Sequence, residues 1–222
     1  MKITALIENK ATGNLIGEHG LAVHIAYNGK QYLLDTGASN KFLNNANQLG
    51  IDLKNIDTAV LSHCHYDHSS GYDGFFSKNS KAKVYLQSAA RELCYAKLGL
   101  IKIYIGIPKG ILNTFVDGDY QIDEGVWLIP HKTMGLAAKG KKAHMYRKTE
   151  QGFVADDFQH EQSLVFEVEK GLVILNSCCH GGVDNIIEEV METFHGKEVV
   201  AVIGGFHLMG STGIKSMSEK PE

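Results

Sequence analysis

The chain has 222 residues, of which 44% are hydrophobic and 21% are charged, so it is long enough to bury a full hydrophobic core. No change in composition divides it, and we expect one domain over residues 1–222. A net charge of −3 gives no reason to expect a nucleic acid or a membrane surface as partner. No apolar run reaches the roughly 18 residues of a membrane span, and the N-terminus lacks the apolar run of a signal peptide.

The four cysteines show no spacing typical of disulfides. Cys178 and Cys179 are adjacent, so a bridge between them would be strained. For Cys94 we expect a small buried apolar side chain. This cysteine usage fits a reducing compartment, and we predict a cytoplasmic protein.

The first half of the chain predicts a β-hairpin followed by helices and strands. Residues 2–8 form an apolar run typical of a strand. Asn28-Gly29 between the runs 21–27 and 31–34 predicts a hairpin, because both residues tolerate the positive φ of a type I′ turn. Ser39 as N-cap and Gly50 as terminal glycine then bound a helix. The next expected elements are a strand at 58–61, a short helix from 69 or 70 to 76, a strand at 83–87 and a helix at 88–97.

The secondary structure expected at the start of the second half is less clear. Alternating isoleucines in 100–125 are interrupted by Pro108 and glycines, which leaves an edge strand and a packed loop both open. The segment 131–157 has no clear period, and we expect a long loop there. The remaining expected elements are a strand at 126–130, a hairpin of 163–168 with 172–175, a helix at 183–194 and a strand at 197–203.

Three imidazoles and one carboxylate stand within six residues after the apolar run 59–61. They are His63, His65, Asp67 and His68. Imidazole and carboxylate groups are the usual ligands of zinc, iron and manganese. If the backbone stays extended past Ser62, His63, His65 and Asp67 share one face, and the cluster supplies two neighbouring metal positions. The alternative is a polar strand end with chance histidines.

This H-x-H-x-D-H pattern after an apolar strand resembles the metal-binding signature of the metallo-β-lactamase superfamily. Three further stretches resemble one branch of it, the β-lactamase superfamily II metal-dependent hydrolases: Leu-Leu-Asp-Thr-Gly at 33–37, Ser-Cys-Cys-His-Gly-Gly at 177–182 and Ile-Gly-Gly-Phe-His-Leu at 203–208. The resemblance implies an α/β fold, an αββα sandwich of two mixed β-sheets with helices outside. Members of the branch continue with a helix and strand carrying His-Cys-Thr-Gly, so we expect a C-terminal truncation relative to them.

The resemblance also implies ligands. His63 and His65 would bind one metal, Asp67 and His68 the other, and His207 would complete the second site.

Two histidines near the second hairpin, His160 and His180, are candidates for one further ligand, the middle ligand in chain order. The segment after the second hairpin carries no aspartate to bridge the metals, and we predict His180 as the ligand there. His160, just before the hairpin, is the weaker candidate. Asp35 would orient a ligating histidine by accepting its free N–H.

These ligands imply hydrolysis, because a bound divalent metal lowers the pKa of water from 15.7 to about 7. We expect one or two zinc ions, with manganese and iron(II) left open, and Asp67 as the group that orients the water and shuttles a proton. The expected substrate is a small ester, lactone, thioester or phosphodiester. We predict that the basic segment 131–157 forms a pocket wall that favours an anionic substrate, against the alternative of a solvated loop.

Two other functions remain open. The same ligand set can hold iron, which allows an oxidoreductase or dioxygenase. A non-catalytic metal-binding sensor would keep the fold without the chemistry. Members of the superfamily that process nucleic acids need extra domains or a basic exosite, so we predict no nucleic-acid partner. The sequence does not predict an oligomeric state.

Overall fold

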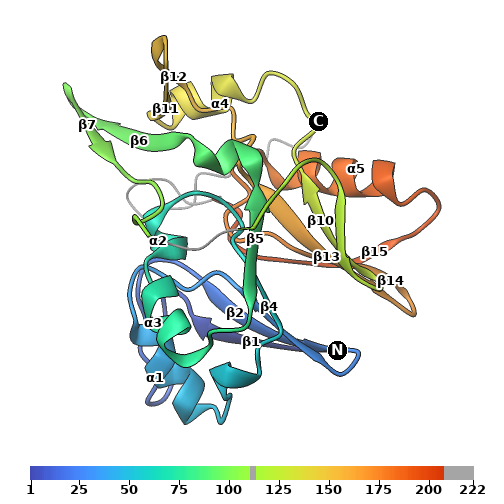
Figure 1. Cartoon of the computed structure of the whole chain (residues 1–222). Coiled ribbons are helices and arrows are strands. Elements are labelled where there is room, and N and C mark those ends of the chain that lie inside the picture. The colour runs from blue at the N-terminus through green and yellow to red at the C-terminus, as the bar shows by residue number, and fades with distance from the viewer. Residues whose placement is uncertain (111–113, 208–222) are drawn as a thin grey trace.

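A computed structural model describes residues 1–110 and 114–207 of the chain, and across these residues the strands form three sheets (Figure 1). The first sheet is antiparallel over its first three strands and parallel from the third strand onward. Its spatial order is β1 (Lys2–Ile7), β2 (Ala22–Tyr27), β3 (Lys30–Leu34), β4 (Thr58–Val60), β5 (Lys83–Gln87) and β8 (Thr114–Val116). Asn28 and Gly29 join β2 to β3 with φ of 46° and 76°, which confirms the predicted hairpin turn.

The second sheet is antiparallel except for its last pair, in which β14 and β15 run parallel. Its order is β15 (Val199–Ile203), β14 (Gly171–Leu175), β13 (Gln162–Val168), β10 (Val126–Pro130) and β9 (Tyr120–Asp123). The predicted hairpin of β13 and β14 and the predicted strands at 126–130 and 197–203 are therefore confirmed.

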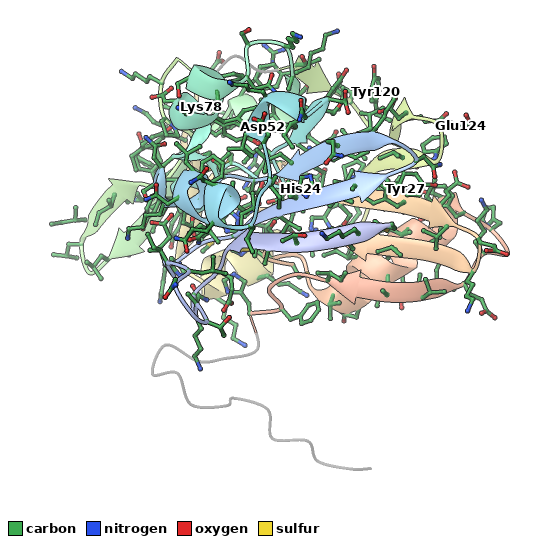
Figure 2. The ribbon with its side chains drawn as sticks, turned by 90° about the horizontal axis from the view of Figure 1, so that it is seen from below. His24, Tyr27, Asp52, Lys78, Tyr120 and Glu124 are labelled. Atoms are coloured by element: carbon green, nitrogen blue, oxygen red, sulfur yellow. A yellow bond between two sulfur atoms is a disulfide. The ribbon has the colours of Figure 1, made fainter. Side chains whose placement is uncertain are left out.

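The two sheets pack face to face, and helices cover their outer faces. Between the sheets lie alternating apolar residues from both, among them Ile25, Leu34, Leu128 and Phe166. In Figure 2, Tyr27 lies at the tip of the β2–β3 hairpin, where its hydroxyl donates to the carbonyl oxygen of Glu167 in the other sheet. The predicted αββα sandwich is confirmed.

The helices are short, and three of them present an apolar side to a sheet. α1 (Lys41–Gln48) and α3 (Tyr72–Lys78) contribute to the core outside the first sheet, and α5 (Val183–Thr193) packs on the second (Figure 1). Asn40, not Ser39, is the N-cap of α1, and the hydroxyl of Ser39 donates to Glu18 and accepts the amide N–H of Lys41 at 3.3 Å. The remaining helical segments are η1 (Leu53–Asn55), α2 (Tyr66–Ser69), η2 (Ser88–Arg91) and α4 (Ala137–Lys142).

A third sheet, which the sequence did not predict, projects from the sandwich at the upper left of Figure 1. Its order is β12 (Gly152–Ala155), β11 (Met145–Thr149), β6 (Leu93–Leu98) and β7 (Ile101–Tyr104). The predicted helix at 88–97 and the predicted loop at 131–157 are both wrong. The first is a single 3₁₀ turn followed by β6, which turns at Gly99 into β7, and the second contains α4, β11 and β12. The edge-strand alternative for the region after residue 100 holds for β7.

Pairing between distant segments explains that difference. β6 pairs with β11, about fifty residues later, and the ring of Tyr95 packs edge-on against Tyr104 of β7 and Phe153 of β12. Cys94 on β6 is fully buried and forms a disulfide with Cys64, 30 residues earlier. The predicted burial of Cys94 is therefore confirmed, but the expectation that no disulfide forms is wrong. Cys178 and Cys179 are free, as the sequence predicts.

The fold brings several strand ends to one edge. Asp35 follows β3, His63 follows β4, His180 follows β14 and His207 follows β15. Strands β3 and β4 run parallel, as do β14 and β15, so their carboxyl ends lie together. In the described part of the chain, no helix is long and apolar enough to cross a membrane.

Candidate metal centre

The six predicted ligands come from three segments, after β4, β14 and β15, and lie close together. The ring centroids of His63 and His65 are 4.5 Å apart, and those of His180 and His207 are also 4.5 Å apart. His63 and His180, from the two halves of the site, have centroids 4.9 Å apart. The sandwich thus places the cluster after β4 opposite the segment after β14.

His63, His65 and His180 form the first candidate ligand group. One ring nitrogen of each lies within 4.8 Å of the others. Their Nε2 atoms are buried and have no hydrogen-bond partner among residues 1–110 and 114–207. Burial, together with the neighbouring imidazoles, lowers the pKa of all three well below its usual value. Buried, neutral imidazole nitrogens without partners are suited to a bound metal ion.

Asp35 orients two imidazoles of the site, those of His63 and His68, as the sequence predicts. Its carboxylate accepts the amide N–H of Ser62 at 2.7 Å and the hydroxyl of Ser62 at 2.7 Å. The Ser62 hydroxyl oxygen is therefore free to accept from Nδ1 of His63, 2.8 Å away. Nδ1 of His68 donates directly to Asp35 at 2.8 Å. His63 consequently directs an unprotonated Nε2 into the site, and Nε2 of His68 faces Sγ of Cys178.

The second candidate group is built around Cys178, which sequence reasoning noted beside the ligands but did not assign. Sγ of Cys178 lies 3.1 Å from Nε2 of His68. Cys178 forms one group with His63 and His68 and another with His180 and His207, each within 4.8 Å. Burial lowers the pKa of His68, but Cys178 and Asp35 outweigh it and raise the pKa above its usual value. The signal that could have identified Cys178 is its spacing from His180, since residues two apart in an extended segment share a face.

Asp67 lies at the margin of the site. Its Oδ2 is 3.5 Å from Nε2 of His68 and 3.2 Å from Nε2 of the exposed His19. Within the described residues it joins none of the compact ligand groups. The backbone is helical from Tyr66, so the extended run assumed past Ser62 ends at His65. Asp67 and His68 approach the site from a helical turn.

His160 lies next to the site with both ring nitrogens engaged. Nδ1 accepts the amide N–H of Cys64 at 3.3 Å, and Nε2 donates to Asp156 at 3.1 Å. Asp156 is itself buried. Burial raises its pKa, but His160 and the amide of Phe158 lower it to about 2. His160 and Asp156 also form a compact group with His65 and Cys94, with ligand atoms within 4.8 Å of one another, so the choice between His180 and His160 stays a prediction.

One lysine of the basic segment 131–157 contacts the loop that carries His180. Nζ of Lys139 on α4 donates to the carbonyl oxygen of Gly181 at 2.6 Å. Two other basic side chains of the segment are paired with acids: Lys132 with Asp119, and Arg147 with Glu92 and Asp157. His131, the first residue of the segment, is buried.

Residues 16–162 match the metallo-β-lactamase superfamily, and this match covers about two thirds of the chain. The chain belongs to this superfamily. A solved metal-dependent hydrolase of the β-lactamase superfamily shares 30% identity with it at a TM-score of 0.79, covering 94% of this chain and 77% of that one. A solved quorum-quenching N-acyl homoserine lactone lactonase is similar in fold, with a TM-score of 0.52 and 16% identity over 84% of this chain and 78% of that one.

Two relatives come from Methanocaldococcus jannaschii. One is 7,8-dihydropterin-6-methyl-4-(β-D-ribofuranosyl)-aminobenzene-5′-phosphate synthase, 27% identical over 243 aligned positions that cover 98% of this chain and 81% of the relative. The other is an uncharacterized protein, 28% identical, covering 94% of this chain and 80% of that protein. Membership of the superfamily and these relatives support an enzyme that depends on metal.

Proposed function

We propose that this metallo-β-lactamase-fold chain is a hydrolase that uses a centre of up to two metal ions, with zinc as the expected metal, to activate water. The observation that carries the proposal is the set of buried Nε2 atoms of His63, His65 and His180, which converge without partners in the described residues. Imidazole nitrogens with a nearby thiolate and carboxylate are a donor set suited to zinc, and iron accepts the same donors.

The residues divide into two proposed sites. His63, His65 and His180 would hold the first metal, and the second would be held by Asp67, His68, Cys178 and His207. A bound divalent metal supplies Lewis acidity, lowering the pKa of bound water and polarising a carbonyl or phosphoryl oxygen.

The protein groups around the site have roles of their own. Asp35 and Ser62 bind the Nδ1 atoms of His68 and His63, which turns Nε2 of both rings toward the proposed metal positions. The ring of Phe158 stacks on His180 with centroids 4.9 Å apart and planes 7° apart, which fixes the plane of that imidazole and excludes water from one face. Asp67, at the partly exposed margin, is placed to accept a proton from an incoming nucleophile.

We further propose a small anionic substrate. Lys139 is the basic residue of the segment 131–157 that contacts the ligand-bearing loop, and its ammonium lies beside Gly181. The archaeal synthase, whose name includes a 5′-phosphate, aligns over 98% of the chain and is consistent with a phosphorylated substrate. The pocket-wall role of the segment remains a prediction.

The synthase relative also favours a second candidate function, a bond-forming reaction at the same metal centre. Iron in the same ligand set would instead favour an oxidation, and bound metal without turnover would favour a non-catalytic sensor. Metal identity and turnover together separate these functions.

Metal analysis of protein purified without added metal, joined to a screen of phosphodiesters, lactones and thioesters, tests the proposal. We expect one to two equivalents of zinc and turnover of at least one anionic ester, both abolished in His65→Ala with Asp67→Ala. Iron with oxygen consumption would point to the oxidoreductase. Bound zinc with no hydrolysis in the screen, but with bond formation between an aminobenzene ribofuranosyl phosphate and a pterin, would favour the synthase.

A further inference from the structure

The loop that carries Cys178 and His180 is held by its backbone. Four successive amide N–H groups point at two side chains. The amides of Cys178 and Cys179 donate to Oδ1 of Asn176, at 3.3 and 2.8 Å. The amides of His180 and Gly181 donate to the two carboxylate oxygens of Glu161, at 2.9 and 3.0 Å. The loop therefore curls around two acceptors that lie on its inner side.

This curl decides where the side chains point. Cys179 has a φ of +49°, a left-handed conformation that a residue with a Cβ adopts rarely, and its side chain is buried in the core beneath α5. The side chains on either side of it, Cys178 and His180, both project into the metal centre. A loop in an unfavourable conformation persists only where its surroundings hold it.

Glu161 is held in turn by a buried cation. It is fully buried, and Nε2 of His131 lies 2.5 Å from one of its oxygens. The other ring nitrogen of His131 lies 2.9 Å from Glu189 of α5. Burial raises the pKa of Glu161, but His131 and the two loop amides outweigh it and lower the pKa, so the group remains a carboxylate. A carboxylate accepts at both oxygens, which two adjacent amides require.

Close packing of Gly181 against His131 also holds the loop in place. A Cβ at Gly181 would lie 2.2 Å from the ring of His131, so only glycine allows the loop to approach this closely. The imidazole, the carboxylate and the glycine backbone thus form one contiguous stack behind His180.

We propose that Glu161 is a positioning residue of the metal centre, whose carboxylate holds the backbone of His180 and Gly181 so that His180 and Cys178 reach the metal ions together. The inference rests on the proposed function only in requiring that these two residues bind metal. Glu161 itself does not touch the metal.

If Glu161 only stabilised the fold, its substitution should have the same effect on metal binding as substitution of Glu189. Both glutamates contact His131, but Glu189 accepts the amides of Lys132 and Thr133, away from the ligand loop. Glu189 is therefore a matched control for the loss of a buried partner of His131.

The test is cobalt(II) binding to Glu161→Gln and Glu189→Gln, beside the melting temperature of each metal-free protein. Glutamine keeps the size of glutamate but turns an N–H donor toward one of the loop amides. In Glu161→Gln we expect cobalt affinity to fall by about 10- to 100-fold and the sulfur-to-cobalt charge-transfer absorption to weaken. In Glu189→Gln we expect a lower melting temperature with affinity within about threefold of wild type and the same absorption.

Wild-type affinity and absorption in Glu161→Gln would overturn the proposal, as would equal losses in both variants. If Glu161→Gln does not fold, Glu161→Asp keeps the charge beside His131 and withdraws the oxygens from the amides, so the same weakened absorption is expected and an unchanged one would overturn the inference. Wild-type protein that binds cobalt through sulfur but hydrolyses nothing would overturn the proposed hydrolase and leave the role of Glu161 standing.

Discussion

Two segments supply the proposed ligands other than His207, and they are supported in different ways. In the first ligand segment, residues 62–68, the ligand rings themselves are held, because Asp35 and Ser62 hydrogen-bond to the rings of His68 and His63. The second ligand segment, residues 176–182, is fixed through its backbone, because Asn176 and Glu161 bind four successive amides.

Because the two segments are supported differently, we expect substitutions around them to weaken metal binding in different ways. Loss of a hydrogen bond to an imidazole changes its tautomer and its strength as a ligand but leaves its position nearly unchanged. Loss of a hydrogen bond to the backbone moves two ligands at once. The first segment should therefore respond to changes of donor and acceptor chemistry, and the second to changes of local geometry.

The largest effect should come from removing a ligand of the first segment. His65→Ala deletes one of three converging imidazoles, and we expect zinc affinity to fall more than about 100-fold, beyond the loss typical of an outer partner. Competition with a chelator measures it. The exposed His195→Ala is the control and should keep wild-type affinity. Retained affinity in His65→Ala would remove that residue from the site.

The disulfide should make the next largest contribution, through the fold around the first segment. Cys64 stands between His63 and His65, and its bond to Cys94 closes a loop with a sequence separation of 30. Cys94→Ala should lower the free energy of unfolding by about 3–4 kcal/mol under non-reducing conditions, because the unfolded chain is no longer restricted. Denaturant unfolding with and without reductant measures it. A variant as stable as oxidised wild type would show that the bond does not contribute.

The second segment should show a dependence on pH. Burial lowers the pKa of His131, but Glu161 and Glu189 outweigh it and raise the pKa to about 9. The folded pKa lies above the unfolded value near 6.5, so the stabilisation is complete below about pH 6.5 and is lost as the pH rises through about 9. Between pH 6 and 9.5 the free energy of unfolding should fall by roughly 3 kcal/mol more in wild type than in His131→Gln. Parallel curves would contradict a charged His131.

Asp35→Asn tests how the side chains of the first ligand segment are supported. Asparagine presents an N–H₂ where Ser62 and His68 need an acceptor, so the tautomer of His68 is no longer set. We expect zinc affinity to fall by about 10- to 100-fold with little change in the sulfur-to-metal absorption from Cys178. Loss of that absorption would mean that the two segments are not supported independently.

The smallest effect should come from the basic segment. Lys139→Glu reverses the charge beside Gly181, and we expect the KM for an anionic substrate to rise by about three- to tenfold at low salt. Lys142→Glu, exposed on the same helix, is the control and should change KM less than about twofold. Equal kinetics in both variants would leave the segment as a solvated part of the surface.

Local patterns predicted most of the sandwich. The Asn28-Gly29 turn, the β13–β14 hairpin and α5 all follow from signals within a few residues. The third sheet could not be predicted in this way, because β6 is made by pairing with β11 far along the chain. Residues 88–97 include good helix formers such as Ala, Leu and Glu, and tertiary pairing overrides that preference.

The residues of the candidate site likewise divide into those that a local sequence pattern predicts and those that only the folded chain reveals. The histidines and Asp67 stand in a dense motif that is visible in the sequence. Glu161 and Asn176 carry no such signal, because their role depends on amides that only the folded loop directs at them. The Cys64–Cys94 disulfide could not be predicted from the spacing of the two cysteines, because Cys94 is placed by β6 of the third sheet.

The central claim is that the two ligand segments meet at a shared metal centre. A crystal structure of zinc-loaded protein with anomalous scattering at the zinc edge tests it directly. We expect one peak about 2.0–2.1 Å from nitrogens of His63, His65 and His180, and a second about 2.3 Å from Sγ of Cys178 beside His68. A peak held instead by His160 and Asp156, or the absence of zinc between the two segments in loaded crystals, would contradict the account.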